Sequence, residues 1–266
     1  MIFLWFISLI FGFNLSFYTY DKWEIYKEIY TFDNYIIFFT NPFYLRVLLD
    51  TILLATTVTL ISLIISYPVG YFLARTEHNR LRTFFIGIII CPYFVNLMVR
   101  LYGWLAFLGR EGMINNILMN LNIIRQPLRL LYNWPGVNIG MIESGCTIMI
   151  FCIYGVVSGI DISYQEAAAV LGADRIRIFL KIILPLSRPG IIAGTLLSFG
   201  SNIGAFLHPM FLGGGYTATL GSLIYTRMSY TMNWPFGATI SYIMLFISFL
   251  IVLFYSRAVK SQVGEY

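Results

Sequence analysis

Long runs of apolar residues, separated by short polar segments, make up most of this chain. A transmembrane helix needs about 20 consecutive, mostly apolar residues. The runs predict six membrane-spanning helices, at about residues 1–20, 47–74, 83–108, 137–160, 189–211 and 236–256. We therefore expect an all-α membrane protein in which residues 1–266 form a single transmembrane domain, with both termini on the same side of the membrane.

The overall composition agrees with a multi-pass membrane protein. Hydrophobic residues account for 59% of the chain and charged residues for 11%, whereas soluble domains contain roughly 25% charged residues. The first run has no basic segment and no small-residue cleavage site, so we expect a retained helix and not a signal peptide. The cysteines have no metal-ligand spacing and the chain holds only two histidines, so we expect neither a metal site nor a bound cofactor.

The polar segment 161–188 interrupts the last third of the chain, and its local signals predict a short helix at its start. Ser163 followed three residues later by Glu166 forms the pattern of a capping box, which pairs the free amides at a helix start. The sequence that follows has high helix propensity. Gly172 stands where a left-handed residue would close the helix.

A second short helix is expected in the same segment. Asp174 can cap it, and its apolar residues recur at the helical spacing: Ile176, Phe179, Leu180 and Ile183. We expect Pro185 to end this helix and Pro189 to lie in the first turn of the next span. The segment 161–188 is therefore predicted to be a rigid helical elbow between two spans.

The distribution of basic residues predicts that the elbow and both termini are cytoplasmic. With this orientation the cytoplasmic segments hold nine lysines and arginines and the remainder of the chain holds eight. The contrast increases when the long segment 109–136 is left out, because long loops contribute little to the positive-inside rule.

The elbow resembles the EAA motif of permease subunits in type I binding-protein-dependent ABC importers. The motif residues are Glu166, Ala167, Ala168, Gly172, Ile182, Leu184 and Pro185. The resemblance implies the type I permease fold in a bacterial inner membrane and identifies the elbow as the coupling helix. The residues implied to contact the ATPase are Glu166, Ala167, Ala168, Gly172, Ala173, Asp174 and Arg175.

The same resemblance implies a set of partners. They are two ABC ATPase subunits, a second, similar permease that completes the translocation path, and an extracytoplasmic substrate-binding protein. ATP would be hydrolysed by the partner subunits, because this chain has no nucleotide-binding motif: the glycines at 212–215 lack the lysine of a phosphate loop. We therefore expect a transport subunit and not an enzyme.

Three further stretches resemble spermidine/putrescine-type permeases, and they indicate a polyamine as the transported solute. They lie at 100–115, 204–215 and 233–239, and the similarity extends over about residues 45–256. One position departs from many of these relatives, since Ala205 stands where they carry an acid.

Candidates for the translocation path lie in two of the predicted spans. One helical face of the fifth span carries Ser198, Ser201, Asn202, Ala205 and His208. These residues could line the path or form hydrogen bonds between helices, and the resemblance favours the path. Glu143 is an acid inside an apolar run, which indicates either a functional group or a side chain that reaches the outer interface. Arg100 is expected to anchor the outer end of the third span.

Two other classes of protein fit the composition less well. An ion-coupled secondary carrier would show inverted repeats and broken helices or paired intramembrane charges. A membrane-embedded enzyme would need clustered acids and histidines near an interface. The sequence shows neither pattern clearly, and an ABC permease for another small solute also stays open.

Overall fold

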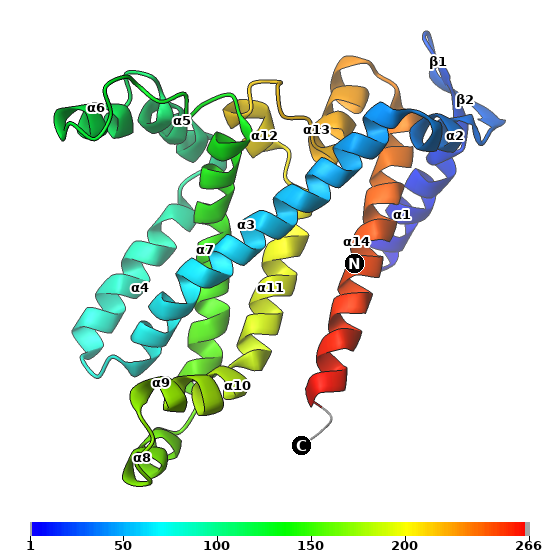
Figure 1. The fold of residues 1–266 in the computed structure, drawn as a ribbon. Coiled ribbons are helices and arrows are strands. Elements are labelled where there is room, and N and C mark those ends of the chain that lie inside the picture. Colours follow the sequence, from blue (N-terminus) through cyan, green and yellow to red (C-terminus); the bar gives the residue numbers. More distant parts are fainter. Residues whose placement is uncertain (1, 264–266) are drawn as a thin grey trace. The chain divides into compact units, whose positions relative to one another are not determined.

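The computed structural model describes residues 2–263, and the side chains of residues 6–257. The first residue of the predicted first span and the last residues of the predicted domain, 264–266, lie outside the described part. The regular elements of the described chain are helices apart from one antiparallel hairpin, formed by β1 (Tyr18–Asp21) and β2 (Ile25–Tyr30) (Figure 1). It divides into two compact units.

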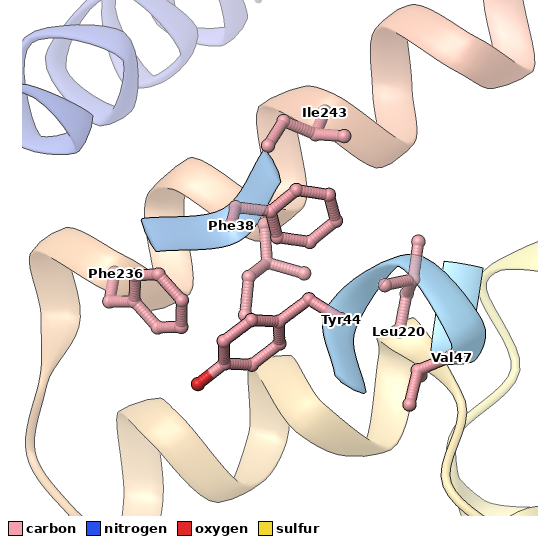
Figure 2. Packing of buried hydrophobic residues seen from close by; sticks show 7 residues of the cluster. Phe38, Tyr44, Val47, Leu220, Phe236 and Ile243 are labelled. Carbon is pink, nitrogen blue, oxygen red and sulfur yellow. The ribbon is translucent and has the colours of Figure 1, made fainter. Parts of the chain in front are cut away.

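Unit 1 combines residues 1–54, 131–137 and 203–266. Besides the hairpin and the start of α3 (Pro42–Arg75), it contains α1 (Ile2–Ser16), α2 (Asp33–Thr40), α12 (Leu207–Leu212), α13 (Leu220–Tyr225), a π-helical turn (Thr226–Tyr230) and α14 (Trp234–Val263). Its core gathers aromatic and branched side chains from α2, α3, α13 and α14 (Figure 2): Phe38, Tyr44, Val47, Leu220, Phe236, Ile240 and Ile243.

Helices α1 and α14 pack antiparallel within unit 1. The Thr239 hydroxyl donates to the Ser16 carbonyl at 2.9 Å, and the Tyr242 hydroxyl donates to the Leu9 carbonyl. Because residue numbers rise in opposite directions along the two helices, the beginning of α1 and the end of α14 point the same way.

Unit 2 combines residues 55–130 and 138–202. It holds the remainder of α3 and most of α7 (Trp134–Ser158), together with α4 (Asn79–Phe94), α5 (Leu97–Leu108), α6 (Met113–Asn120), α8 (Ser163–Val170), α9 (Arg175–Ile178), a π-helical turn (Phe179–Ile183), α10 (Leu184–Leu186) and α11 (Arg188–Ile203). One core cluster joins α3 and α7 through Tyr67, Met149, Ile153 and Val157.

Three of the predicted spans correspond to long apolar helices. They are Pro42–Arg75, Trp134–Ser158 and Trp234–Arg257, and the count rises to five if each of two bent helix pairs is one span. The first predicted span corresponds to α1, which is shorter than predicted because it ends at Ser16 and the chain turns into β1 at Tyr18. Within the described residues, length and composition thus support three to five spans, and the predicted six are not all reproduced.

The prediction of one continuous helix over 83–108 is wrong. The chain breaks at residues 95–96, and the helical segments on either side differ in direction by 102°. Two local features mark the break. The Val95 amide donates to the Pro92 carbonyl at 3.1 Å, three residues back, which closes the end of α4. The Asn96 side chain accepts the Met98 amide at 2.8 Å, which starts α5 as a new helix.

The predicted fifth span, 189–211, is also interrupted. Helix α11 ends at Ile203 and α12 begins at Leu207. Gly204 begins the intervening segment and has a low helix propensity. A Cβ built on Gly221 would lie 2.9 Å from the Ala205 carbonyl oxygen and 3.1 Å from that of Gly204. The irregular segment therefore packs its backbone directly against α13.

Two glycines, Gly190 and Gly194, let α11 approach α7 closely. A Cβ at Gly190 would lie 2.8 Å from the Cys152 carbonyl oxygen, and one at Gly194 would lie 2.5 Å from the Met149 sulfur. Residues four apart share one helix face, and small residues at this spacing are a common way for membrane helices to pack.

We expect Gly190→Ala to destabilise the protein by roughly 1–3 kcal/mol, because the added methyl group meets a backbone oxygen that cannot rotate away. Gly200→Ala on the same helix is the matched control, since nothing lies within 4 Å of its Cβ. Alanine is better than glycine in a helix by about 1 kcal/mol, so the control should be neutral or stabilising. Thermal unfolding in detergent measures both, and equal midpoints would contradict the close packing.

Candidate functional site

The elbow, residues 161–188, begins with helix α8. The Asp161 carboxylate accepts the Ser163 amide at 2.9 Å, and this bond holds the pKa of Asp161 below its usual value. The predicted capping box of Ser163 and Glu166 is wrong: Ser163 is the first helical residue, and no side chain of the N-cap residue caps α8. The carboxylate of Asp161, two residues earlier, accepts the hydrogen bond of the Ser163 amide instead.

The turn after α8 has the predicted left-handed glycine. Gly172 has a φ of +82°, and the amides of Gly172 and Ala173 donate to Ala169 and Ala168 at 3.0 Å each. This pattern closes the carboxyl end of a helix. The predicted cap of the second helix is also confirmed, because the Asp174 carboxylate accepts the Arg177 amide at 2.8 Å.

Pro185 does not end the second helix, so that prediction is wrong. The helical backbone runs from α9 through the π-helical turn Phe179–Ile183 into α10, which contains Pro185. A π-helical turn shifts the hydrogen-bond register, and this turn ends at Ile183, two residues before the proline that lacks an amide hydrogen. Pro189 lies in the first turn of α11, as predicted.

The tip of the elbow exposes apolar side chains. Val170 and Leu171 are each 87% exposed, and Ile176 and Tyr164 are more than half exposed. Of the predicted ATPase-contacting residues, Ala168 and Ala173 are half-buried and the others, Glu166, Ala167, Gly172, Asp174 and Arg175, are exposed. Contiguous exposed apolar residues with a polar rim are typical of protein interfaces. Docking by these residues stays a prediction.

Two of the predicted path residues form a contact between helices. The Asn202 amide nitrogen donates to the Thr59 hydroxyl of α3 and to the Ser198 hydroxyl, both at 3.3 Å. Asn202 and Ser198 are buried, whereas Ser201 is exposed. The hydrogen-bonding interpretation thus describes Asn202 and Ser198, and the structure leaves a path role for any of the three as a prediction.

The remaining members of that predicted face do not continue it. Ala205 lies in the irregular segment after α11, and His208 is a buried residue of the separate helix α12. The prediction of a single helical face over 198–208 is therefore wrong, because helix α11 ends at Ile203.

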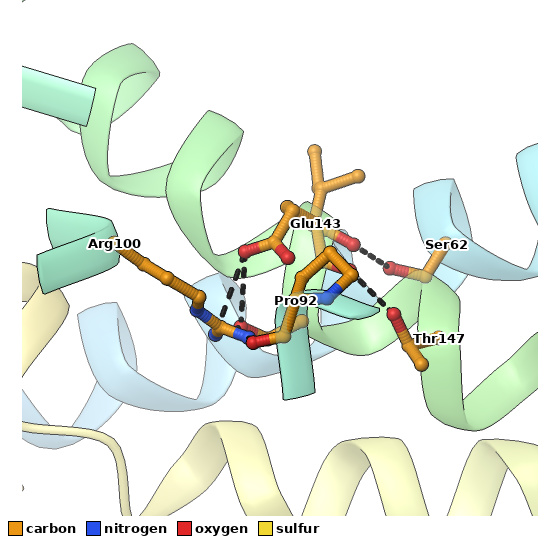
Figure 3. A network of polar contacts seen from close by, with 7 residues as sticks. Ser62, Pro92, Arg100, Glu143 and Thr147 are labelled. Atoms are coloured by element: carbon orange, nitrogen blue, oxygen red, sulfur yellow. Dashed lines mark hydrogen bonds and ion pairs between the residues drawn. The ribbon is translucent and has the colours of Figure 1, made fainter. Parts of the chain in front are cut away.

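Glu143 of α7 pairs with Arg100 of α5 in the apolar part of the chain (Figure 3). The Arg100 Nη2 atom lies 3.5 Å from the Glu143 carboxylate and donates to the Ser144 hydroxyl at 2.6 Å, while Nη1 donates to the Pro92 carbonyl at 3.2 Å. The side chains of Arg100 and Glu143 are 14% and 26% exposed. The pair borders a cavity of about 320 Å³ lined by Pro92, Arg100, Gly103, Trp104, Phe107 and Glu143.

The apolar pattern of the sequence places Arg100 and Glu143 in different predicted spans and does not predict this pair. Arg100 was expected to anchor the outer end of a span, whereas its guanidinium group reaches the carbonyl of Pro92 beside the helix break. The sequence nevertheless contains a signal for this pair. Two charges of opposite sign, each inside one of two consecutive apolar runs, need partners, and each can serve as the partner of the other.

The described residues contain no group of histidines, cysteines and acids that could hold a metal ion. Among the three cysteines, Cys91 is exposed, Cys146 and Cys152 are half-buried, and all are free thiols.

Comparison with solved structures identifies the fold as that of an ABC importer permease. A bacterial ABC transporter involved in the import of the acidic polysaccharide alginate contains a chain that superposes with a TM-score of 0.81. The match covers 97% of this chain and 92% of that chain at 17% identity. At this identity the likeness shows the fold alone.

The chain belongs to the family of binding-protein-dependent transport system inner membrane components, which matches residues 66–261. The spermidine/putrescine transport system permease protein PotB of Escherichia coli (strain K12) is 33% identical over 96% of this chain and 94% of its own length. The molybdenum transport system permease protein ModB of the same organism is 30% identical over 81% of this chain and 96% of its own.

We expect Glu143→Met to destabilise the protein more than the double substitution Arg100→Met/Glu143→Met. Removing one partner leaves a charge in an apolar site, whereas removing both does not. The single variant should cost roughly 1–3 kcal/mol, less than the ~3–5 kcal/mol of a fully buried pair, because Glu143 is 26% exposed.

The control is the exposed pair Arg46 and Asp50 on α3, whose charged atoms lie 4.0 Å apart. Substituting either should change stability by less than about 1 kcal/mol. The midpoint of thermal unfolding, measured for each purified variant, gives the change in stability. A double variant that is less stable than Glu143→Met would show that the two charges do not depend on each other.

Proposed function

We propose that this chain is the permease subunit of an ABC importer that transports a small organic cation of the polyamine class. The observation that carries the proposal is the 33% identity to a spermidine/putrescine permease over almost the whole of both chains. In this proposal the chain forms half of the translocation path, and ATP-driven movements open the path alternately to either side.

The cavity beside Glu143 has chemistry that would suit such a cargo. Both contacts of the Glu143 carboxylate, to Arg100 and to the Ser144 hydroxyl, are long at 3.5 Å. Trp104 and Phe107 line the same cavity, and aromatic faces attract ammonium groups. We therefore propose Glu143 as a candidate for contact with cargo, beside Ser198, Ser201, Asn202, Ala205 and His208 as candidates for the path.

The partners proposed for the complex are two ABC ATPase subunits, a second, similar permease and an extracytoplasmic binding protein. A solved relative in fold is an alginate ABC transporter in complex with a pentasaccharide-bound periplasmic protein. The exposed apolar tip of the elbow, Val170 and Leu171, offers a surface of the kind that docks on an ATPase. This chain would bind no cofactor, and ATP would be hydrolysed by the partners.

The location proposed is a bacterial inner membrane, with both termini and the elbow in the cytoplasm. The antiparallel packing of α1 and α14 supports termini on one side. The cytoplasmic position of the elbow depends on its contact with the ATPase, so the docking experiment below tests both.

Deleting the gene should abolish uptake of radiolabelled spermidine or putrescine in a strain that lacks other polyamine importers, and the intact gene should restore it. Molybdate uptake serves as the control, because ModB is also similar to this chain. Unchanged polyamine uptake together with lost molybdate uptake would assign the chain to another solute class.

We expect Gly172→Glu to abolish transport and weaken co-purification of the ATPase, at normal membrane abundance. The positive φ makes a side chain costly by only about 1 kcal/mol, too little to unfold the domain. Nothing in this chain lies within 4 Å of a Cβ at Gly172, so the loss would come from the partner.

The matched control is Gly172→Asn, because asparagine tolerates the left-handed conformation and carries no charge. It should retain most ATPase binding. Full uptake and full ATPase binding by Gly172→Glu would contradict docking at the elbow.

A further inference from the structure

Three side chains on one face of α3 reach the elbow or its ends. Tyr67, Tyr71 and Arg75 are four residues apart, and this spacing places them on one side of a helix. We call these three residues the α3 stripe. Because α3 is not joined to the elbow along the chain, contacts of this stripe are a separate connection.

Arg75 and Tyr71 contact the beginning of the elbow. The Arg75 Nη1 atom donates to the Ile160 carbonyl at 2.9 Å, in the residue that directly precedes the elbow. Gln165 of α8 lies against both stripe residues. In one orientation its amide oxygen accepts from the Tyr71 hydroxyl at 3.3 Å, and in the other it accepts from Arg75 at 2.9 and 3.1 Å.

Tyr67 contacts the end of the elbow. Its hydroxyl and the Ser187 hydroxyl lie 2.7 Å apart, and both residues are buried. Between the two ends, the ring of Phe179 meets the edges of Tyr67 and Tyr71, with centroid distances of 5.5 and 6.2 Å. Phe179 is the first residue of the π-helical turn, so the stripe touches the elbow at its start, middle and end.

We propose that the α3 stripe fixes the elbow to α3, so that a displacement of the elbow moves α3 together with the two helices that flank the elbow, α7 and α11. The inference rests on the proposed function, in which an ATPase moves the elbow. The stripe residues are positioning residues, because they act on the path through α3. They hold the elbow through buried or charge-assisted hydrogen bonds, which resist sliding more than apolar contacts do.

The first experiment uses the assembled complex in liposomes with its ATPase subunits and binding protein. Tyr67→Phe and Arg75→Ala should assemble and hydrolyse ATP at rates near wild type, but should raise the ATP consumed per transported cargo at least about threefold. Tyr67→Phe keeps the ring that packs on Phe179 and removes only the hydroxyl group.

The matched controls are Tyr93→Phe and Arg80→Ala, which alter exposed residues outside the elbow and the stripe and should leave the ratio unchanged. A purely structural role of the stripe would lower the amount of assembled complex without changing the ATP consumed per transported cargo. A wild-type ratio in both stripe variants would overturn the proposal.

A second experiment covers variants that fail to assemble. Cysteines replace Tyr71 and Gln165 in a chain whose own cysteines are serines, and a short bis-maleimide reagent links them. If elbow and α3 move together, the linked complex still transports at the rate of the unlinked one. Loss of transport only after linking would show that the elbow slides along α3.

If Gly172→Glu has no effect on transport or ATPase binding, the proposed docking at the elbow is wrong. If only the stripe tests fail, docking stands without the stripe.

Discussion

Inside a membrane, every backbone polar group must find a partner within the protein, and this constraint determines how a span of this chain can break. At the interruption after α4, the Asn96 side chain accepts the Met98 amide of α5, while the Pro92 carbonyl accepts both the Val95 amide and the guanidinium group of Arg100. That cation then needs its own partners, which are Glu143 and Ser144 on α7. The ion pair of Arg100 and Glu143 therefore contacts the helix break directly, through the bond of Arg100 to the Pro92 carbonyl.

Helix α3 satisfies the same constraint in another way, by placing small hydroxyl groups against its neighbours in unit 2. The Ser66 hydroxyl donates to the Cys146 carbonyl of α7 at 3.2 Å, and Thr59 accepts from Asn202 of α11. Both bonds cross between helices without introducing a charge. Such bonds are individually modest, about 0.6 kcal/mol on average in a membrane protein, so α3 depends on several of them along its length.

The sequence predicted those features that local chemistry controls. Gly172 and Asp174 act on backbone groups a few residues away, so their roles could be assigned without knowing the fold. The bend near Pro92 and the continuation through Pro185 could not be assigned, because proline is tolerated in membrane helices wherever neighbours replace the lost bond. The pairing of Arg100 with Glu143 depends on which helices become neighbours, information that hydrophobic periodicity does not contain.

The contacts at the elbow end of unit 2 restrict where movement can occur. Gly190 and Gly194 bring the backbone of α11 against α7, and Arg75 ties α3 to the residue that ends the turn after α7. Close-packed interfaces of this kind shift as bodies and do not deform continuously. In the proposed transport function, a displacement of the elbow would therefore be accommodated at an interruption between helices of unit 2, such as residues 95–96, and not within the packed helices.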